Sequence, residues 1–286
     1  MNILVTGAKG QLGTELRLRT RETENRHWIF ADIIADEGIV PLDITDEAAV
    51  RRLVEENHID LIINCAAYTN VDRAEEDEAT AERLNADAVR ILGSMQTRIL
   101  HISTDYVFSG EGWIPCREDD PVAPRTAYGR TKLHGEEALL QVNPDAIIIR
   151  TAWLYSPYGN NFVKTMLKYG KERDKLTVVY DQVGTPTYAG DLAEAILTIV
   201  TGENWQAGIY HFTNEGVCSW YDFTIEILRQ AGVQCRVEPI LSSQYAYKTP
   251  RPHYSVLDKS KFKKTFGVEI PYWIDGLKRC LRTLNG

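Results

Sequence analysis

The stretch ILVTGAKGQLG, residues 3–13, decides the fold, because an apolar strand-like run meets three glycines spaced three apart. A helix-like segment follows over residues 14–21. Strand, glycine turn and helix in this order are the context in which a glycine motif indicates dinucleotide binding. Glycines lack β-carbons, so the backbone can turn tightly and approach a pyrophosphate, while the helix N-terminus offers free N–H groups. The alternative, an ordinary loop, is disfavoured by this context. We expect the turn to contact a dinucleotide through Gly7, Lys9, Gly10, Gln11, Leu12 and Gly13.

Strands and helices alternate along the first 150 residues. Apolar runs predict further strands at residues 28–30, 61–67, 99–104 and 146–150. Between them lie helix-like segments. Asp46 could cap the start of one of them, and the most highly charged of them covers residues 71–95. This alternation argues for an α/β fold with a doubly wound, parallel sheet of the Rossmann type.

The pattern becomes irregular after residue 150. We expect a loop at 151–160 and a turn at 184–187, with helices and strands at 161–173, 176–180, 191–201, 209–212, 219–231, 236–240 and 272–284. The run at 209–212 should return to the main sheet, and the rest should form a smaller, discontinuous C-terminal lobe. The expected domains are therefore residues 1–155 plus about 186–214 for the dinucleotide, and about 156–185 plus 215–286 for the substrate. The cleft between them should hold the substrate.

The choice between NADH and NADPH stays open. Asp32 lies nineteen residues after Gly13, about where an acidic residue receives the adenosine ribose 2′-hydroxyl and repels a 2′-phosphate. Lys9 could instead attract that phosphate, and either side chain could simply be a solvated charge. Small side chains at the end of the 61–67 run would let a flat cofactor pass, or would only pack tightly. The remaining cofactor candidates are Asp43, Ile44, Ala66, Ala67, Tyr68 and Asn85.

Composition excludes several classes of function. The net charge of -8 and pI near 5.4 argue against a polyanion-binding surface, so we expect no nucleic-acid partner. The five cysteines are scattered and contain no C-x-x-C, which favours free thiols in a reducing compartment over a zinc site. Met1 leads almost directly into a strand-like run, so we expect no signal peptide, and no apolar stretch approaches the roughly 18 residues of a membrane span. We expect a cytoplasmic protein.

A tyrosine and a lysine four residues apart, Tyr128 and Lys132, share one helix face, so an ammonium group can act on a phenol. Ser103 and Thr104 end the strand before this helix, and ligands in open α/β sheets bind outside such carboxyl ends. Chance produces tyrosine–lysine pairs at this spacing, and the alternative is an ordinary surface pair on a helix.

The three motifs in one α/β pattern resemble the extended short-chain dehydrogenase/reductase superfamily, in its nucleotide-sugar branch. Longer motifs narrow the resemblance: NCAAYT (64–69), STDYVF (103–108), RTAWLY (150–155), GNNFV (159–163), DQVGTPT (181–187) and RP (251–252). Together they resemble the dTDP-4-dehydrorhamnose reductases over essentially the whole chain.

This resemblance implies hydride transfer from NADPH or NADH to C4 of dTDP-4-dehydro-L-rhamnose, giving dTDP-L-rhamnose. It assigns Tyr128 as proton donor to the forming alkoxide, Thr104 as a hydrogen-bond donor to the same oxygen, and Lys132 as the partner of Tyr128 and of the nicotinamide ribose. Such a reaction needs a proton donor and hydrogen bonds aimed at the oxygen. For a tyrosine to work near pH 7, we expect the site to stabilise its phenolate by about 4 kcal/mol.

The residues around this set refine the expected chemistry. The resemblance places Asp-Glu directly after the threonine in nucleotide-sugar 4,6-dehydratases, whereas Asp105 and Tyr106 stand here, which favours net reduction. Trp153 could lie against the sugar or the cofactor, or could be a core residue. The candidates for the substrate are Thr104, Asp105, Tyr106, Trp153, Asn161, Lys164 and Arg251, of which the last three would bind the nucleotide diphosphate or are ordinary surface or structural groups.

Alternatives remain for assembly and for activity. Some members of the family dimerise through Mg²⁺ held by acids on the first helix and near Asp191. Glu15 and Asp191 are present, but Gly190 replaces an expected acid, and two carboxylates are poor support for Mg²⁺. A homodimer stays possible. The chain could also be another nucleotide-sugar epimerase or dehydratase, or a non-enzymatic relative resembling the regulatory subunit of methionine adenosyltransferase.

Overall fold

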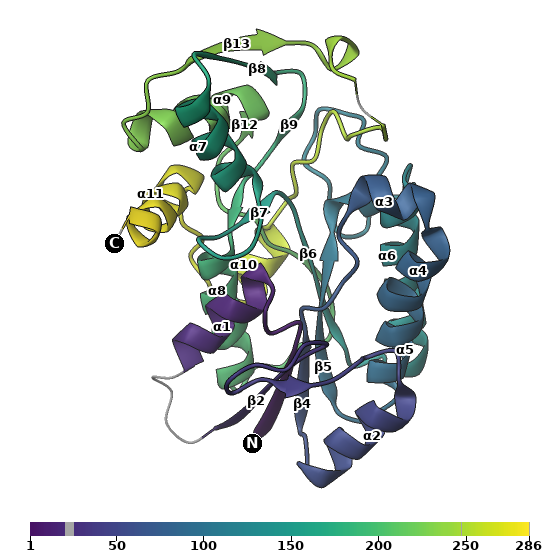
Figure 1. Cartoon of the computed structure of the whole chain (residues 1–286). Coiled ribbons are helices and arrows are strands. Elements are labelled where there is room, and N and C mark those ends of the chain that lie inside the picture. The colour runs from purple at the N-terminus through teal and green to yellow at the C-terminus, as the bar shows by residue number, and fades with distance from the viewer. Residues whose placement is uncertain (21–25, 247, 286) are drawn as a thin grey trace.

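A computed structural model describes residues 1–20, 26–246 and 248–285, and in this part of the chain a parallel sheet forms the centre of the molecule (Figure 1). The order of its strands is β11-β6-β5-β4-β1-β2-β3, and every pairing is parallel. Their bounds are β1 (Asn2–Thr6), β2 (His27–Asp32), β3 (Val40–Pro41), β4 (Leu61–Asn64), β5 (Arg98–Thr104), β6 (Ile147–Thr151) and β11 (Gly208–His211). The predicted α/β class and the predicted return of residues 209–212 to the main sheet are confirmed.

The sheet is covered on both faces because its strands are apolar on both sides. On β1, Ile3 and Val5 face a core built with α1 (Gln11–Thr20), α8 (Ala189–Thr201) and α10 (Ser260–Phe266). Leu4 faces the opposite core, built with α2 (Glu47–Glu56), α5 (Ala88–Gly93) and α6 (Ala127–Val142). Figure 1 shows the two helical layers on either side of the strands. Strands buried on both faces are typical of parallel sheets, and the predicted doubly wound arrangement is confirmed.

The helix predicted over residues 71–95 is wrong as a single element. It consists of α3 (Val71–Glu76), α4 (Glu78–Glu82), a π-helical turn (Arg83–Asp87) and α5. The break lies at Asp77, whose non-helical backbone (φ −143°, ψ 68°) lets its carboxylate accept a hydrogen bond from the Thr80 N–H at 3.1 Å. A helix restarts at such a cap, which a charged and otherwise continuous sequence hides. The predicted cap at Asp46 is confirmed, since its side chain accepts from the Ala49 N–H.

A smaller lobe lies beyond the carboxyl ends of the main strands. Its core gathers aromatic side chains from α7 (Phe162–Glu172), α9 (Trp220–Gln230) and α11 (Trp273–Asn285). Short sheets join β7 (Leu154–Tyr155) to β10 (Thr187–Tyr188), β9 (Val183–Gly184) to β12 (Cys218–Ser219), and β8 (Lys175–Val179) to β13 (Arg236–Ile240).

Several predicted boundaries differ from the observed ones. The predicted loop 151–160 contains β7, and the predicted turn 184–187 begins in β9 and ends in β10. β4 stops at Asn64, so residues 65–67 are loop. The first helix begins at Gln11, and its predicted last residue, Arg21, lies outside the described residues. None of the helices within the described ranges has the length and apolar character needed to cross a membrane.

Candidate active site

A cleft of about 530 Å³ lies over the carboxyl ends of β1, β4, β5 and β6. It is the place where ligands bind in open α/β sheets. One wall is the glycine turn, the floor is the end of β5, and the opposite wall is the start of α6. Residues of the predicted sites that line it are Gly10, Gln11, Leu12, Ala67, Thr104, Asp105, Tyr106, Tyr128, Lys132, Trp153 and Asn161.

The glycine turn packs tightly, and its glycines have different roles. Gly7 has φ +68°, and a β-carbon there would lie 2.6 Å from the Ala66 nitrogen. A β-carbon on Gly13 would collide with the Gly7 carbonyl oxygen and with Ala8. On Gly10 it would meet only the Gly7 oxygen, at 3.2 Å, and Gly10 faces the cleft. A cradle with this open side fits a dinucleotide pyrophosphate.

The last two glycines of the turn, Gly10 and Gly13, therefore give a matched pair of variants. Gly13→Ala should lower the free energy of unfolding by about 1–3 kcal/mol, because backbone has to move. Gly10→Ala should leave stability nearly unchanged and weaken NADPH binding about tenfold or more, since the new methyl group points into the cleft. Thermal unfolding and fluorescence titration with NADPH measure the two effects. Equal losses of stability in both variants would contradict this division of roles.

The charges expected at the adenosine end lie together. Asp32 accepts a hydrogen bond from the Lys9 N–H at 2.9 Å, and the Lys9 ammonium lies 3.1 Å from an Asp36 carboxylate oxygen. Asp36 was not anticipated from the sequence. Asp43 is exposed and bonds Thr45, which lowers the pKa of its carboxyl.

Ala66, Ala67 and Tyr68 form the loop after β4, and Asn85 holds this loop in place. Asn85 is fully buried and bonds the Tyr68 N–H at 2.8 Å, the Tyr68 carbonyl at 3.1 Å and the Thr131 hydroxyl at 3.0 Å. These bonds tie the loop to α6. Its side chain does not line the cleft, so it reaches the expected cofactor surface only through Tyr68. Ile44 is likewise buried, in the core that the sheet forms with α2, α5 and α6.

Tyr128 and Thr104 meet at the floor of the cleft. Burial raises the pKa of Tyr128 to about 12, while a hydrogen bond with Thr104 acts in the opposite direction. The Thr104 hydroxyl donates to the Asp105 carboxylate at 3.0 Å and accepts from the Tyr106 N–H at 3.2 Å. Burial also raises the pKa of Asp105 to about 7. The sequence-based expectation of a stabilised phenolate is therefore not met by the protein alone, because desolvation favours the neutral phenol.

Lys132 lies one turn further along α6 and is 1% exposed. Its ammonium nitrogen donates to the Ile102 carbonyl at 2.7 Å and lies 3.1 Å from His101 Nε2. Burial lowers the pKa of Lys132 to about 8, and the nearby Glu136 carboxylate opposes that shift. Lys132 is thus buried and fixed in position, unlike a surface lysine.

The smaller lobe contributes an apolar cavity of about 390 Å³ next to the cleft. The Trp153 ring stacks on Trp220 at 3.5 Å between ring centres, and Phe162 packs against Trp220. Trp153 has φ +49°, a costly backbone conformation for a bulky residue and one that clusters at functional sites. Tyr106 lines both spaces and meets the Tyr128 ring edge-on at 5.4 Å.

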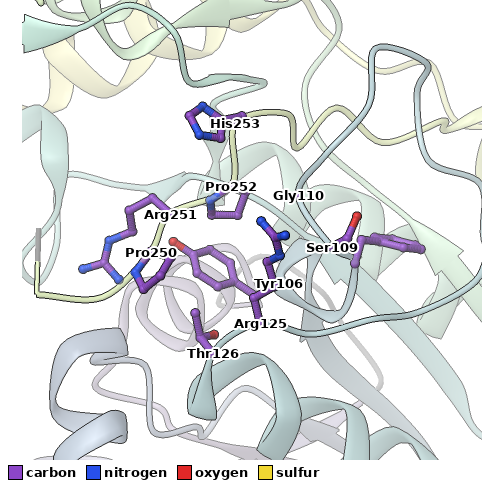
Figure 2. A pocket seen from close by; sticks show the side chains of 10 residues that line it. Tyr106, Ser109, Gly110, Arg125, Thr126, Pro250, Arg251, Pro252 and His253 are labelled. Carbon is purple, nitrogen blue, oxygen red and sulfur yellow. The ribbon is translucent and has the colours of Figure 1, made fainter. Parts of the chain in front are cut away.

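Arg251 approaches this cavity from the C-terminal segment. It donates to an Asp72 carboxylate at 2.7 Å, which draws residues 250–253 toward α3. Figure 2 shows Arg251 and Tyr106 at one end of a narrow adjoining pocket, which Arg125, Pro252 and His253 also line.

Asn161 and Lys164 make structural bonds, which was the alternative to ligand binding considered for them from the sequence. Asn161 caps α7 by accepting from the Lys164 N–H, and its amide donates to Gln11 at 2.9 Å, which joins the two lobes. The Lys164 ammonium donates to the Gly159 carbonyl at 2.7 Å. Lys164 lines neither the cleft nor the apolar cavity.

The carboxylates considered for Mg²⁺ do not fit the ion. Arg19 pairs with Glu15, Arg279 pairs with Asp191 at 2.5 Å, and Asn214 donates to Asp191 at 2.6 Å. Arg19 also occupies the space that a side chain at Gly190 would need. The described residues contain no group of three or more potential metal ligands. Guanidinium groups neutralise these acids, so we derive no metal-bridged contact from them.

Besides Asp36, sequence reasoning missed four further side chains of the site: Asn64, His101, Trp220 and Asp72. A signal existed for His101, because a histidine inside the apolar run 99–102 must find a polar partner when that strand is buried. Trp220 and Asp72 carried no such signal, since Trp153 lies 67 residues before Trp220 (220 − 153 = 67) and Arg251 lies 179 residues after Asp72.

Together, the parallel sheet, the glycine turn and the Thr104, Tyr128 and Lys132 cluster define a member of the extended short-chain dehydrogenase/reductase superfamily. The family model described as "RmlD substrate binding domain" matches residues 1–285. The chain belongs to this family, that of the dTDP-4-dehydrorhamnose reductases.

Individual relatives agree with this assignment over their full lengths. A dTDP-4-dehydrorhamnose reductase from Aggregatibacter actinomycetemcomitans is 40% identical and covers 96% of this chain and 97% of its own. The crystal structure of a dTDP-4-dehydrorhamnose reductase from Clostridium acetobutylicum is 42% identical, with a TM-score of 0.93 and full coverage of both chains. That of the Bacillus anthracis enzyme in complex with NADP is 35% identical, with a TM-score of 0.89 and 99% coverage of each chain.

Proposed function

We propose that this chain reduces the C4 ketone of dTDP-4-dehydro-L-rhamnose to dTDP-L-rhamnose with NADPH or NADH, and that Tyr128 donates the proton. The observation that carries the proposal is the convergence of Tyr128, Thr104 and Lys132 in one cleft, across from the glycine turn. The relatives named dTDP-4-dehydrorhamnose reductase support the choice of substrate.

The residues present fit a nicotinamide dinucleotide. The turn from Gly7 to Gly13 would hold the pyrophosphate, and Lys9 and Asp32 would face the adenosine ribose. Lys132 would bind the nicotinamide ribose. The bound dihydronicotinamide supplies the hydride. NADP in the Bacillus anthracis relative supports this assignment.

The protein's own side chains donate a proton and hydrogen bonds to the oxygen of the ketone. Negative charge builds on that oxygen as the carbonyl is reduced, and the phenol of Tyr128, neutral because of its burial, is in the form that can donate a proton. Thr104 would give a second hydrogen bond. Its single hydroxyl proton points to Asp105, so Thr104 has to turn to the substrate, or Asp105 has to be protonated and donate to Thr104 instead.

The nucleotide end of the substrate would occupy the smaller lobe. Trp153 and Trp220 offer apolar faces for stacking, and Arg251 can bind phosphate oxygens. Asp105 and Tyr106 would border the sugar. In this proposal residues 1–155 with about 186–214 bind the cofactor, and about 156–185 with 215–286 bind the nucleotide sugar.

A direct assay tests the proposal. Purified protein mixed with dTDP-4-dehydro-L-rhamnose should consume NADPH or NADH, detected as loss of nicotinamide absorbance, and should form dTDP-L-rhamnose, identified by NMR. Turnover without added reductant would point instead to an epimerase or dehydratase, and Tyr106 in place of a glutamate weighs against the latter. No turnover with either cofactor would refute the proposed reaction.

A further inference from the structure

His101 is a buried polar residue that the reaction described above does not use. It lies on β5 between Asn64 on β4 and Lys132 on α6, and it is 0% exposed. Its Nδ1 lies 3.0 Å from the Asn64 amide nitrogen, and its Nε2 lies 3.1 Å from the Lys132 side-chain nitrogen. A neutral imidazole has one N–H donor and one acceptor nitrogen, so these two contacts constrain each other.

The orientation of the Asn64 amide decides the tautomer of His101. The Asn64 oxygen accepts from the Ala66 backbone N–H at 3.1 Å and from the Thr6 hydroxyl at 2.7 Å. A backbone N–H can only donate, so the amide oxygen must face Ala66 and the amide nitrogen must face His101. That nitrogen donates to Nδ1, and the ring proton of His101 is therefore on Nε2, directed at Lys132.

Lys132 then faces an N–H donor on one side and the Ile102 carbonyl on the other. An ammonium group can satisfy only the carbonyl, whereas a neutral amine donates to Ile102 and accepts from His101. We propose that His101 is a positioning residue for Lys132: held by Asn64 as the Nε2–H tautomer, it donates to the lysine nitrogen and favours the amine over the ammonium. The functional consequence rests on the role of Lys132 proposed above.

The other charged groups around this pair act differently. Glu136, one turn later on α6, favours the ammonium, but its carboxylate is bound by Arg150 of β6 at 2.7 Å. Asp105, which follows β5, accepts a hydrogen bond from Thr104, and its charge raises the pKa of Tyr128. Burial raises the pKa of the Cys65 thiol to about 12, so that group at the end of β4 stays neutral. Burial and the charge of Lys132 lower the pKa of His101, which keeps the ring neutral and its tautomer defined.

The tautomer can be measured without turnover. Long-range ¹H–¹⁵N correlation spectra of protein labelled with ¹⁵N-histidine should find His101 protonated at Nε2 and bare at Nδ1 from pH 6 to 9. The signals are assigned by their loss in His101→Gln. If that variant does not fold, they are assigned by their shift in Lys132→Met, which retains the aliphatic stem. A ring protonated at Nδ1, singly or doubly, would overturn the proposal.

The pH profile tests the effect on Lys132. The ammonium is present below its pKa and lost above it, so kcat/KM for the sugar at saturating NADPH should fall as pH rises through about 8. In His101→Gln the amide oxygen can accept from the ammonium, and this alkaline limb should move up by about one pH unit, the size expected for one hydrogen bond.

A second buried histidine provides the control. His211 is equally buried, but its ring bonds the Cys116 carbonyl rather than a lysine. His211→Gln should leave the alkaline limb at its original pH. If the alkaline limb of the kcat/KM profile stayed at its wild-type pH in His101→Gln, the proposal would be overturned. Wild-type protein without reductase turnover would refute the proposed function, and the spectra would still decide the tautomer.

Discussion

Tyr128→Phe is expected to lower kcat for NADPH-dependent ketone reduction by about 10²–10⁴-fold, the contribution typical of a positioned general acid. The substitution removes one oxygen and leaves the ring, which packs edge-on against Tyr106. The alkoxide that forms on the substrate then lacks its nearest proton donor. Steady-state kinetics measure the loss in kcat, and fluorescence titration should give an NADPH Kd close to that of the wild type.

The neighbouring tyrosine provides the matched control for this variant. Tyr106→Phe removes a hydroxyl from the same cleft and keeps the same ring contact. Because Tyr106 is assigned to the substrate surface, this change should raise KM and keep kcat within about tenfold. If Tyr128→Phe retained kcat to the same degree, Tyr128 would not be the proton donor.

Glu136→Ala is expected to destabilise the protein by about 3–5 kcal/mol, because it leaves a charge buried without its partner. Glu136 and Arg150 form a bidentate pair, with Nε–Oε1 at 2.9 Å and Nη2–Oε2 at 2.7 Å. Their side chains are 1% and 3% exposed. Water cannot solvate the guanidinium when the carboxylate is removed. Equilibrium unfolding in denaturant measures the loss.

An exposed ion pair with similar geometry shows how much of this stability loss is due to burial rather than to the pairing itself. Arg130 binds Glu78 through two bonds of 2.9 Å, with side chains 37% and 47% exposed. Glu78→Ala should cost no more than about 1 kcal/mol, since water replaces the lost partner. A loss below about 1 kcal/mol for Glu136→Ala would contradict the role given to the buried pair.

The sequence predicted the central sheet because its signals are local. Strand-like runs of three to six residues and a glycine turn between strand and helix are properties of neighbours along the chain, and they hold for β1, β5 and β6. The break at Asp77 and the short strand β7 were not predicted. Asp77 acts as a cap only once its backbone leaves the helical conformation, and β7 exists because β10, more than 30 residues later, pairs with it (187 − 154 = 33).

The site was predictable where its residues share an element or a motif. Tyr128 and Lys132 lie on one face of α6, and Thr104 ends β5. Lys164 and Asn85 were assigned to ligands by position, yet the folded chain engages both in bonds to backbone or loop. The type of a polar side chain does not indicate which partner it will bond in the folded chain. The network through Asn64 and His101 joins three elements and emerges only when the sheet brings them together.

In the proposed reaction this chain delivers hydride to C4 of a 4-keto sugar nucleotide, and Tyr128 completes the reduction. The most direct measurement uses dTDP-4-dehydro-L-rhamnose and NADPH dideuterated at C4 of the nicotinamide. We expect dTDP-L-rhamnose with one deuterium, located at C4 of the sugar by NMR, and a rate of labelling reduced about 10²–10⁴-fold in Tyr128→Phe. Product without deuterium at C4, or labelling that is as fast in Tyr128→Phe as in the wild type, would contradict the proposed reaction.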